Sequence, residues 1–230
     1  MTKNILLYLL MGLSLLLTSC ANLKQITDTI THSSDSSHNK TGLYIQPDLD
    51  HGLIQSPINI HSFNEKTTNT HDLTFHYEDK IKAVENLGHT VQLDFEVGSI
   101  ISYEGIEYDF KQMHFHTPSE HLIDGITFPM EMHIVTQNSS RGKNDAPRYL
   151  VIGILFKEGK TNKFIDEFLN LIPQKERSLT SLKKGTVKLD DLFSSDELHD
   201  VENFYHYQGS LTTPPYTETV QWFVFKPVVE

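Results

Sequence analysis

Residues 112–121, which read QMHFHTPSEH, decide the fold because they place two histidines in an alternating polar and apolar run. Side chains two residues apart on a β-strand project from the same face of the sheet. His114 and His116 are therefore expected on one face of a strand, and Met113 and Phe115 on the opposite face. The alternation predicts a strand with one polar face and one face in the core.

A second run, MEMHIV at residues 130–135, repeats this pattern with Glu131, His133 and Val135 on one face. Three imidazoles on two strands can therefore converge. Taken alone, the H-x-H spacing also fits a pair of half-exposed strand histidines. A carboxylate and an imidazole that alternate with Met and Ile are, however, an unusual choice for a core face without a function.

His114, His116 and His133 are candidate zinc ligands, because neutral imidazoles suit this metal and three protein ligands leave a fourth position open for water. Gln112 and Glu131 each precede a candidate ligand by two residues. On the same strand face they can accept a ring N–H and thereby decide which nitrogen meets the metal. The sequence thus predicts a catalytic type of metal site.

Length and charge favour one acidic domain. The 230 residues suit a single domain with a sizeable core and an N-terminal appendage. Lys and Arg number 19 against 30 Asp and Glu, a formal charge of -11, which makes nucleic acid an improbable partner. The partner that we expect is a small-molecule substrate.

The N-terminus is typical of an exported lipoprotein. Residues 1–19 carry one charge, Lys3, and an apolar run too short to span a membrane, as in a signal peptide. Residues 17–20, LTSC, resemble the bacterial lipobox, so Cys20 is the expected lipidation site. It is the only cysteine, which excludes an intramolecular disulfide. With Ala21 next, we expect lipid anchoring on the periplasmic side, in the outer membrane of a Gram-negative bacterium.

The rest of the chain divides into a tether and one domain. Residues 20–40 hold the lipidated cysteine and a flexible, polar segment, and residues 41–230 form the domain. Short alternating runs dominate the domain, and residues 162–172 are the best helix. This pattern predicts a mainly β fold with a large, mostly antiparallel central sheet and a few peripheral helices. The expected strands, besides the two histidine runs, are residues 56–60, 71–78, 89–97, 100–110, 149–156 and 219–225.

Six segments together resemble the α-class carbonic anhydrases, in the order of that family. They are QSPINI (55–60), NLGH (86–89), QMHFHTPSEH (112–121), EMHIV (131–135), GSLTTPP (209–215) and Trp222. The resemblance covers most of the chain after the tether and implies the fold of that family.

The resemblance also implies roles for the residues of the site. His114, His116 and His133 would bind zinc, with Gln112 and Glu131 as the hydrogen-bond partners of the ligands. Thr212 would donate its proton to Glu120 and receive a hydrogen bond from a hydroxide on the zinc. His89 would shuttle protons. On a regular strand, however, it would share a face with the apolar residues 91, 93 and 95, so it could also face the core. The carbon dioxide pocket would be formed by Val135, Val151, Leu211, Thr213 and Trp222.

The implied function is the zinc-dependent, reversible hydration of carbon dioxide to bicarbonate and a proton, a carbonate dehydratase activity. Members of the family usually carry an N-terminal Trp-Gly-Tyr segment, which we do not find, and they continue past Glu230. We therefore expect a truncated C-terminal strand region. The alternative is a lipid-anchored zinc- or partner-binding protein with little or no catalysis, and ester hydrolysis is a possible side activity. The sequence leaves the oligomeric state open.

Overall fold

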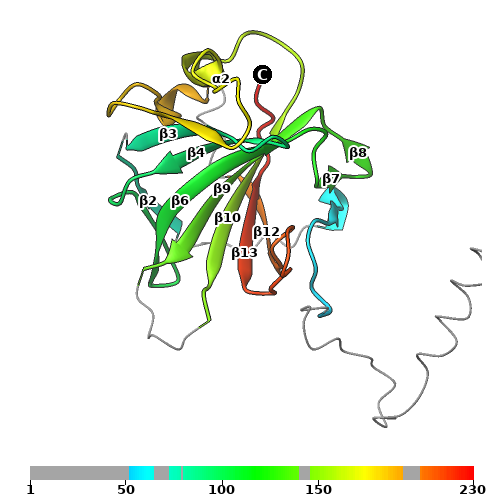
Figure 1. Ribbon diagram of the computed structural model, residues 1–230. Coiled ribbons are helices and arrows are strands. Elements are labelled where there is room, and N and C mark those ends of the chain that lie inside the picture. Colours follow the sequence, from blue (N-terminus) through cyan, green and yellow to red (C-terminus); the bar gives the residue numbers. More distant parts are fainter. Residues whose placement is uncertain (1–51, 65–72, 79, 140–145, 194–202) are drawn as a thin grey trace, which may run out of the picture. The chain divides into compact units, whose positions relative to one another are not determined.

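The computed structural model of the chain describes residues 52–64, 73–78, 80–139, 146–193 and 203–230 (Figure 1). The predicted signal peptide, Cys20 and the tether up to residue 40 lie outside these residues, so the predictions made for them stay predictions. None of the helices in the described part of the chain has the length and the apolar character that a membrane span needs.

The described strands form a ten-stranded sheet and a small three-stranded sheet. The large sheet runs in the order β11-β3-β4-β6-β9-β10-β13-β12, and β5 joins it beside β6 and pairs with β2. Its neighbours are antiparallel, except for the parallel pair β10 and β13. The predicted fold class is confirmed. The strands are Leu73–His76 (β2), Ile81–Asn86 (β3), Val91–Phe95 (β4), Ile100–Tyr103 (β5), Ile106–His116 (β6), Met130–Asn138 (β9), Tyr149–Phe156 (β10), Ser178–Ser181 (β11), Phe204–Gly209 (β12) and Val220–Phe225 (β13).

The small sheet holds β1 (Asn59–Ile60), β7 (Leu122–Ile123) and β8 (Ile126–Thr127). Figure 1 shows β7 and β8 as a hairpin beside the large sheet. Two 3-10 turns, η1 (Ser62–Asn64) and η2 (Leu189–Asp191), complete the elements of the described residues together with one helix.

The two histidine strands are neighbours in the centre of the large sheet. β6 and β9 pair antiparallel, with His114 directly opposite His133 and His116 opposite Glu131. A bulge after Phe110 shifts the register just before the polar residues begin. Because side chains of directly paired residues lie on the same face, this register brings the three predicted ligands together.

The core lies on both faces of the sheet, as strand β10 shows. Leu150, Ile152 and Ile154 belong to a large apolar cluster on one face, and Val151 and Leu155 belong to a smaller cluster on the other. All are at most 2% exposed, so the prediction of a doubly covered strand is confirmed. Full burial of such a side chain contributes about 1.5–3 kcal/mol, which makes β10 a rigid support for the strands beside it.

Helix α2 (Lys163–Leu169) is shorter at its C-terminal end than the predicted helix over residues 162–172. Asn162 is its N-cap, and the side chain accepts a hydrogen bond from the Ile165 backbone N–H at 3.3 Å. The apolar pattern predicted a helix that is too long, because Leu171 and Ile172 pack against the core from the turn that follows the helix. Figure 1 shows α2 near the C-terminal end of the chain, where the Asn162 side chain also donates to the Glu230 carbonyl.

Three predicted strands are shorter than expected. Residues 56–60 form only the two-residue β1. Of the strand predicted over residues 71–78, residues 71 and 72 lie outside the described part of the chain, and β2 ends at His76. The strand predicted over residues 89–97 ends at Phe95, because Val97 lies in the following turn and is 81% exposed. The edge strand β12 was not predicted. Its sequence, FYHYQG, does not separate into a polar and an apolar face, so alternation gave no signal there.

Candidate metal centre

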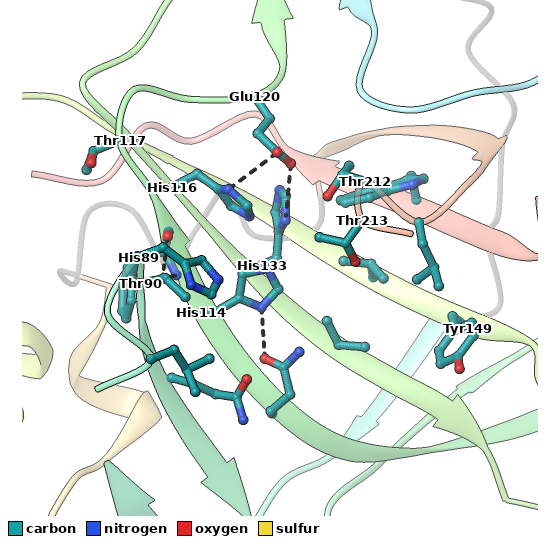
Figure 2. A pocket seen from close by; sticks show the side chains of 18 of the residues that line it. His89, Thr90, His114, His116, Thr117, Glu120, His133, Tyr149, Thr212 and Thr213 are labelled. Carbon is teal, nitrogen blue, oxygen red and sulfur yellow. Dashed lines mark hydrogen bonds and ion pairs between the residues drawn. The ribbon is translucent and has the colours of Figure 1, made fainter. Parts of the chain in front are cut away.

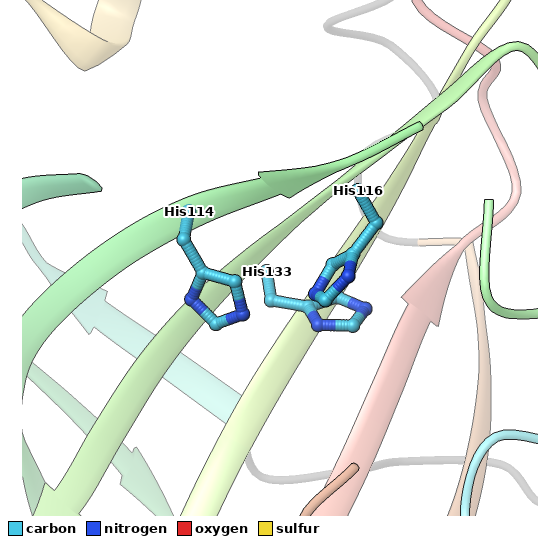
Figure 3. A group of neighbouring side chains, drawn as sticks. All are labelled: His114, His116 and His133. Atoms are coloured by element: carbon cyan, nitrogen blue, oxygen red, sulfur yellow. The ribbon is translucent and has the colours of Figure 1, made fainter. Parts of the chain in front are cut away.

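The three predicted ligands meet on one face of the large sheet. His114 and His116 come from β6 and His133 comes from β9, and each offers a ring nitrogen that lies within 4.8 Å of those of the other two. The ring centroids are 4.9 Å (114 to 116), 5.4 Å (114 to 133) and 4.5 Å (116 to 133) apart. Figure 3 shows the three rings turned toward a common point, as donors to a single ion must be.

The Gln112 and Glu131 side chains each lie within hydrogen-bond distance of one imidazole. The Gln112 Oε1 atom lies 2.8 Å from His114 Nδ1, and the Glu131 Oε1 atom lies 2.9 Å from His133 Nε2. Because these oxygens accept a hydrogen bond from the ring N–H, His114 is left to present Nε2 and His133 is left to present Nδ1. The i and i+2 spacing on each strand is thus sufficient to select the nitrogen of two ligands.

His116 provides an independent test of whether a cation fits. Its Nε2 atom is buried and has no hydrogen-bond partner among the described residues, while its Nδ1 atom lies 3.4 Å from Glu120 Oε1. A buried polar nitrogen without a partner is costly unless something occupies the space in front of it. Three nitrogen donors, one of them with this unfilled capacity, form the donor set that zinc prefers.

Burial keeps the three imidazoles uncharged, which is the state in which they can bind a metal. It lowers the pKa of His114 to about 3, with a further contribution from the neighbouring imidazoles, and it also lowers the pKa values of His116 and His133. Burial alone would raise the pKa of Glu131, but hydrogen bonds from His121 and His133 hold that pKa well below its usual range. At neutral pH the three rings are therefore uncharged and Glu131 is a carboxylate, as metal binding requires.

His121 is a residue next to the site that the sequence analysis did not single out, although it ends the stretch that decided the fold. Its side chain is fully buried, and its Nδ1 and Nε2 atoms lie 2.6 Å from Glu131 Oε1 and 2.6 Å from the Tyr207 hydroxyl. His121, Glu131 and His133 also form a cluster with metal-ligand spacing. Both imidazoles in it, however, are already hydrogen-bonded to Glu131 Oε1. Tyr207 follows His121 by 86 residues, so no local pattern connects the two.

The imidazoles open into a cavity of about 620 Å³. All five residues predicted for the carbon dioxide pocket line this cavity, together with Glu120, Thr212 and the three imidazoles. Figure 2 shows Thr212 and Thr213 on the side of the cavity opposite His114 and His116. The cavity lining therefore combines nitrogen donors with apolar side chains. These apolar side chains, here called the apolar wall, are Val135, Val151, Leu211 and Trp222.

His89 lies in the same cavity and is exposed to solvent. It precedes β4, which begins only at Val91, so it does not belong to the alternation that would have turned it into the core. Gly88 has a φ of 89°, a conformation that glycine adopts readily, and it turns the chain just before His89. Figure 2 shows the His89 ring beside His114.

The predicted hydrogen bond between Thr212 and Glu120 is not made in the structure. The Glu120 carboxylate lies instead against the imidazoles, with Oε1 3.4 Å from His116 Nδ1 and Oε2 3.9 Å from His133 Nδ1. Its Oε2 atom is buried and has no hydrogen-bond partner among the described residues. Both side chains line the cavity, so Glu120 and Thr212 are close to the metal centre without being bonded to each other.

The fold and this site define a class of protein: a mainly β domain whose central strands hold three imidazoles for one metal ion beside an apolar wall. Comparison with known proteins assigns the family. The sequence model of the eukaryotic-type carbonic anhydrases matches residues 45–230. The chain belongs to this family.

Individual relatives agree with the family assignment. A carbonic anhydrase of Neisseria gonorrhoeae is 37% identical over 177 residues, and alpha carbonic anhydrase 6 of Arabidopsis thaliana is 34% identical over 181 residues. These alignments cover 76% and 77% of this chain but only 64% of each relative. The chain thus spans slightly less than two thirds of the length of these two relatives.

Solved structures show the same fold. The alpha-carbonic anhydrase from Thermovibrio ammonificans, in complex with sulfanilamide, superposes with a TM-score of 0.67 at 32% identity, over 77% of this chain and 73% of that chain. The enzyme from Photobacterium profundum gives 0.65 at 30% identity, over 78% and 76%.

Proposed function

We propose that the protein catalyses the reversible hydration of carbon dioxide to bicarbonate and a proton. One observation carries the proposal: three uncharged imidazoles converge on a single point in a cavity that apolar side chains also line. The imidazoles can hold a Lewis acid, and the apolar side chains can hold a small substrate without net charge. Membership of the carbonic anhydrase family supports the same reaction.

In this proposal His114, His116 and His133 hold zinc, while Gln112 and Glu131 fix the orientation of two of the rings. Bound zinc is a Lewis acid that lowers the pKa of a water molecule, to about 7 in carbonic anhydrases generally, a property of the family rather than a quantity obtained from this chain. The protein contributes a dry, shaped site, because Glu131 and His133 are at most 1% exposed.

The apolar wall binds the substrate. Val135, Val151, Leu211 and Trp222 can offer no charge and only one polar hydrogen, that of the Trp222 indole, which already donates to the Ser210 carbonyl at 3.0 Å. Such a wall favours carbon dioxide over the charged bicarbonate product, which promotes release of the product. Thr213 lies in the same cavity and gives it a polar edge.

Protons are handled by three side chains. A hydroxyl both donates and accepts, whereas an ionised carboxylate only accepts, so Thr212 can donate to Glu120 Oε2 and still accept from a reacting water. The unpartnered Oε2 atom has the capacity for this bond. The exposed His89 ring lines the same cavity and can pass a proton to buffer, since an imidazole has one nitrogen that accepts and one that donates.

A stopped-flow hydration assay, combined with zinc analysis on the same sample, tests the proposal. We expect about one zinc per chain, rapid hydration of carbon dioxide, and inhibition by a sulfonamide that competes for the metal. Stoichiometric zinc without turnover would overturn the proposed activity. It would support the alternative, a carbonic-anhydrase-like protein that binds zinc or a partner without catalysis. This alternative is favoured by one observation: no hydrogen bond joins Thr212 to Glu120 in the structure.

For the location of the protein, we propose export to the periplasmic side and anchoring to the outer membrane through lipidated Cys20. The support is the apolar run of residues 5–17 together with the sequence LTSC at residues 17–20. A Cys20→Ser variant should lose the lipid and appear in the soluble periplasmic fraction, as measured by mass spectrometry and fractionation. Membrane association that survives this substitution would contradict the anchor.

A further inference from the structure

A buried chain of hydrogen bonds leads away from the metal centre. It runs from His133 Nε2 to Glu131 Oε1 (2.9 Å), from Glu131 Oε1 to His121 Nδ1 (2.6 Å), from His121 Nε2 to the Tyr207 hydroxyl (2.6 Å), and from there to Ser56 Oγ (2.9 Å). The chain thus joins strand β9 to the edge strand β12 and to the segment before β1.

The far end of the chain is anchored on the backbone. Ser56 Oγ accepts the Ser210 N–H at 3.1 Å, and the Ser56 N–H donates to Ser210 Oγ at 2.9 Å. The near end is equally constrained, because Glu131 Oε2 accepts the backbone N–H groups of Glu120 and His121 at 2.9 Å and 2.8 Å. Glu131 therefore receives four hydrogen bonds, which leaves its carboxylate little freedom to move.

The protons in this chain can be placed by counting donors and acceptors. An ionised Glu131 only accepts, so His121 Nδ1 and His133 Nε2 carry hydrogens. Tyr207 has one hydroxyl proton and two neighbours, His121 Nε2 and Ser56 Oγ. If Tyr207 donated to Ser56, the Ser56 proton would have no acceptor within hydrogen-bond distance among the described residues, and His121 would need a second proton.

The opposite direction satisfies every group. Ser56 then accepts from the Ser210 N–H and donates to Tyr207, and Tyr207 donates to the bare Nε2 atom of a neutral His121. This arrangement also avoids a fully buried imidazolium close to a divalent cation, which would be electrostatically unfavourable. Burial raises the pKa of the Tyr207 hydroxyl, so the phenol retains the proton that it donates.

We propose that Tyr207 is a positioning residue of the metal centre: by donating to Nε2 of His121 it fixes the ring whose Nδ1–H donates to Glu131, so that Glu131 can orient His133. Tyr207 does not touch the metal or the substrate. It acts through His121 and Glu131, and its effect is to keep His133 Nδ1 directed at the ion. The inference rests on the proposed function only in that His133 is taken to bind zinc.

The tautomer of His121 can be measured in the metal-free protein by long-range ¹H–¹⁵N correlation NMR, without any activity assay. In the wild-type protein we expect His121 to carry one ring hydrogen, on Nδ1. In Tyr207→Phe, which removes only the hydroxyl, Glu131 still holds the hydrogen on Nδ1 but Nε2 loses its donor, so we expect the Nε2 ¹⁵N signal to move away from its wild-type position. Ser56→Ala should retain it, because the proposed direction leaves the Tyr207 donor in place.

The metal provides the second measurement. Zinc competition with a chelator should show affinity weakened roughly threefold to tenfold in Tyr207→Phe, below the roughly 10- to 100-fold typical of a direct partner of a ligand. The visible spectrum of the cobalt-substituted protein should change with it. Tyr205→Phe is the matched control on the same strand, since its ring contacts Lys226 and not His121, and we expect wild-type behaviour.

Each other outcome overturns the inference. Two ring hydrogens on wild-type His121 would reverse the direction of the chain. A shifted Nε2 signal in Tyr207→Phe with unchanged zinc affinity would remove the positioning role, and so would weakened affinity with an unshifted signal. A wild-type protein that binds no zinc would instead overturn the proposed function and the positioning role with it, and the NMR result would still report the direction of the hydrogen bonds.

Discussion

The two faces of strand β9 are both buried but are built in different ways. On one face Met132 is fully buried in the larger apolar cluster, as is Met113 on the neighbouring strand β6. On the other face Glu131 and His133 are 0% and 1% exposed, and they belong to the metal centre. Burial therefore does not distinguish the core face from the functional face. What distinguishes them is whether each buried atom needs a particular partner.

The core face is held by the hydrophobic effect, which has no direction and scales with buried area. It tolerates substitutions of similar volume. The functional face must provide a donor or an acceptor for every polar atom, because an unpaired buried group costs about 1–3 kcal/mol. Four hydrogen bonds meet this requirement at Glu131. We therefore expect substitutions on the two faces to separate stability from metal binding.

The largest effect is expected for His133→Ala, which removes one of the three nitrogen donors. Zinc should no longer co-purify, and hydration should fall by more than the roughly 100-fold upper figure for the loss of a ligand's partner. Zinc analysis and stopped-flow assays measure both. His76→Ala is the control, because this strand histidine has a side chain that is 67% exposed and lies outside the site. Retained zinc with full turnover would exclude His133 as a ligand.

Met132→Ala tests the opposite face of the same strand. It leaves a cavity in the larger apolar cluster, so the free energy of unfolding of the metal-free protein should fall by about 2–5 kcal/mol. Urea unfolding measures this change, and the zinc content of the folded protein should not alter. Met132→Leu keeps the volume and should cost less than about 1.5 kcal/mol. Loss of zinc in folded Met132→Ala would mean that the two faces are not independent.

Glu131→Gln keeps the size of the side chain but replaces one acceptor by an N–H₂ donor among four N–H groups. We expect zinc affinity to fall roughly 10- to 100-fold, since the orientation of His133 depends on this carboxylate. Chelator competition measures the affinity, with Glu107→Gln on the exposed part of β6 as control. An unchanged affinity would show that the hydrogen bonds to Glu131 serve folding alone.

The smallest effect is expected for His89→Ala, because buffer can replace an exposed proton carrier. Turnover in dilute buffer should fall by well under roughly 100-fold, and added imidazole should restore it. Zinc content should stay at the wild-type level, since His89 lies at the mouth of the cavity and holds no metal. An unchanged rate in dilute buffer would point to another route for the proton.

The part of the site that could be predicted from sequence lies within single strands. His114 with Gln112, and His133 with Glu131, are two residues apart, so strand alternation alone places them on a common face. The membership of the apolar wall needed the family resemblance, because Val135, Val151, Leu211 and Trp222 come from different elements. His121 and Tyr207 could not be predicted, because their hydrogen bond spans 86 residues.

The sequence by itself determined the sheet-rich fold, the polar and apolar faces of the histidine strands, and the identity of the candidate ligands, since these follow from a period of two and from the chemistry of imidazole. Only the tertiary structure decided that His114 lies opposite His133, that Glu120 turns toward the imidazoles, and that Tyr207 reaches His121. The physical reason is that strand register and contacts between distant segments depend on the packing of the whole sheet, which no local pattern of residues contains.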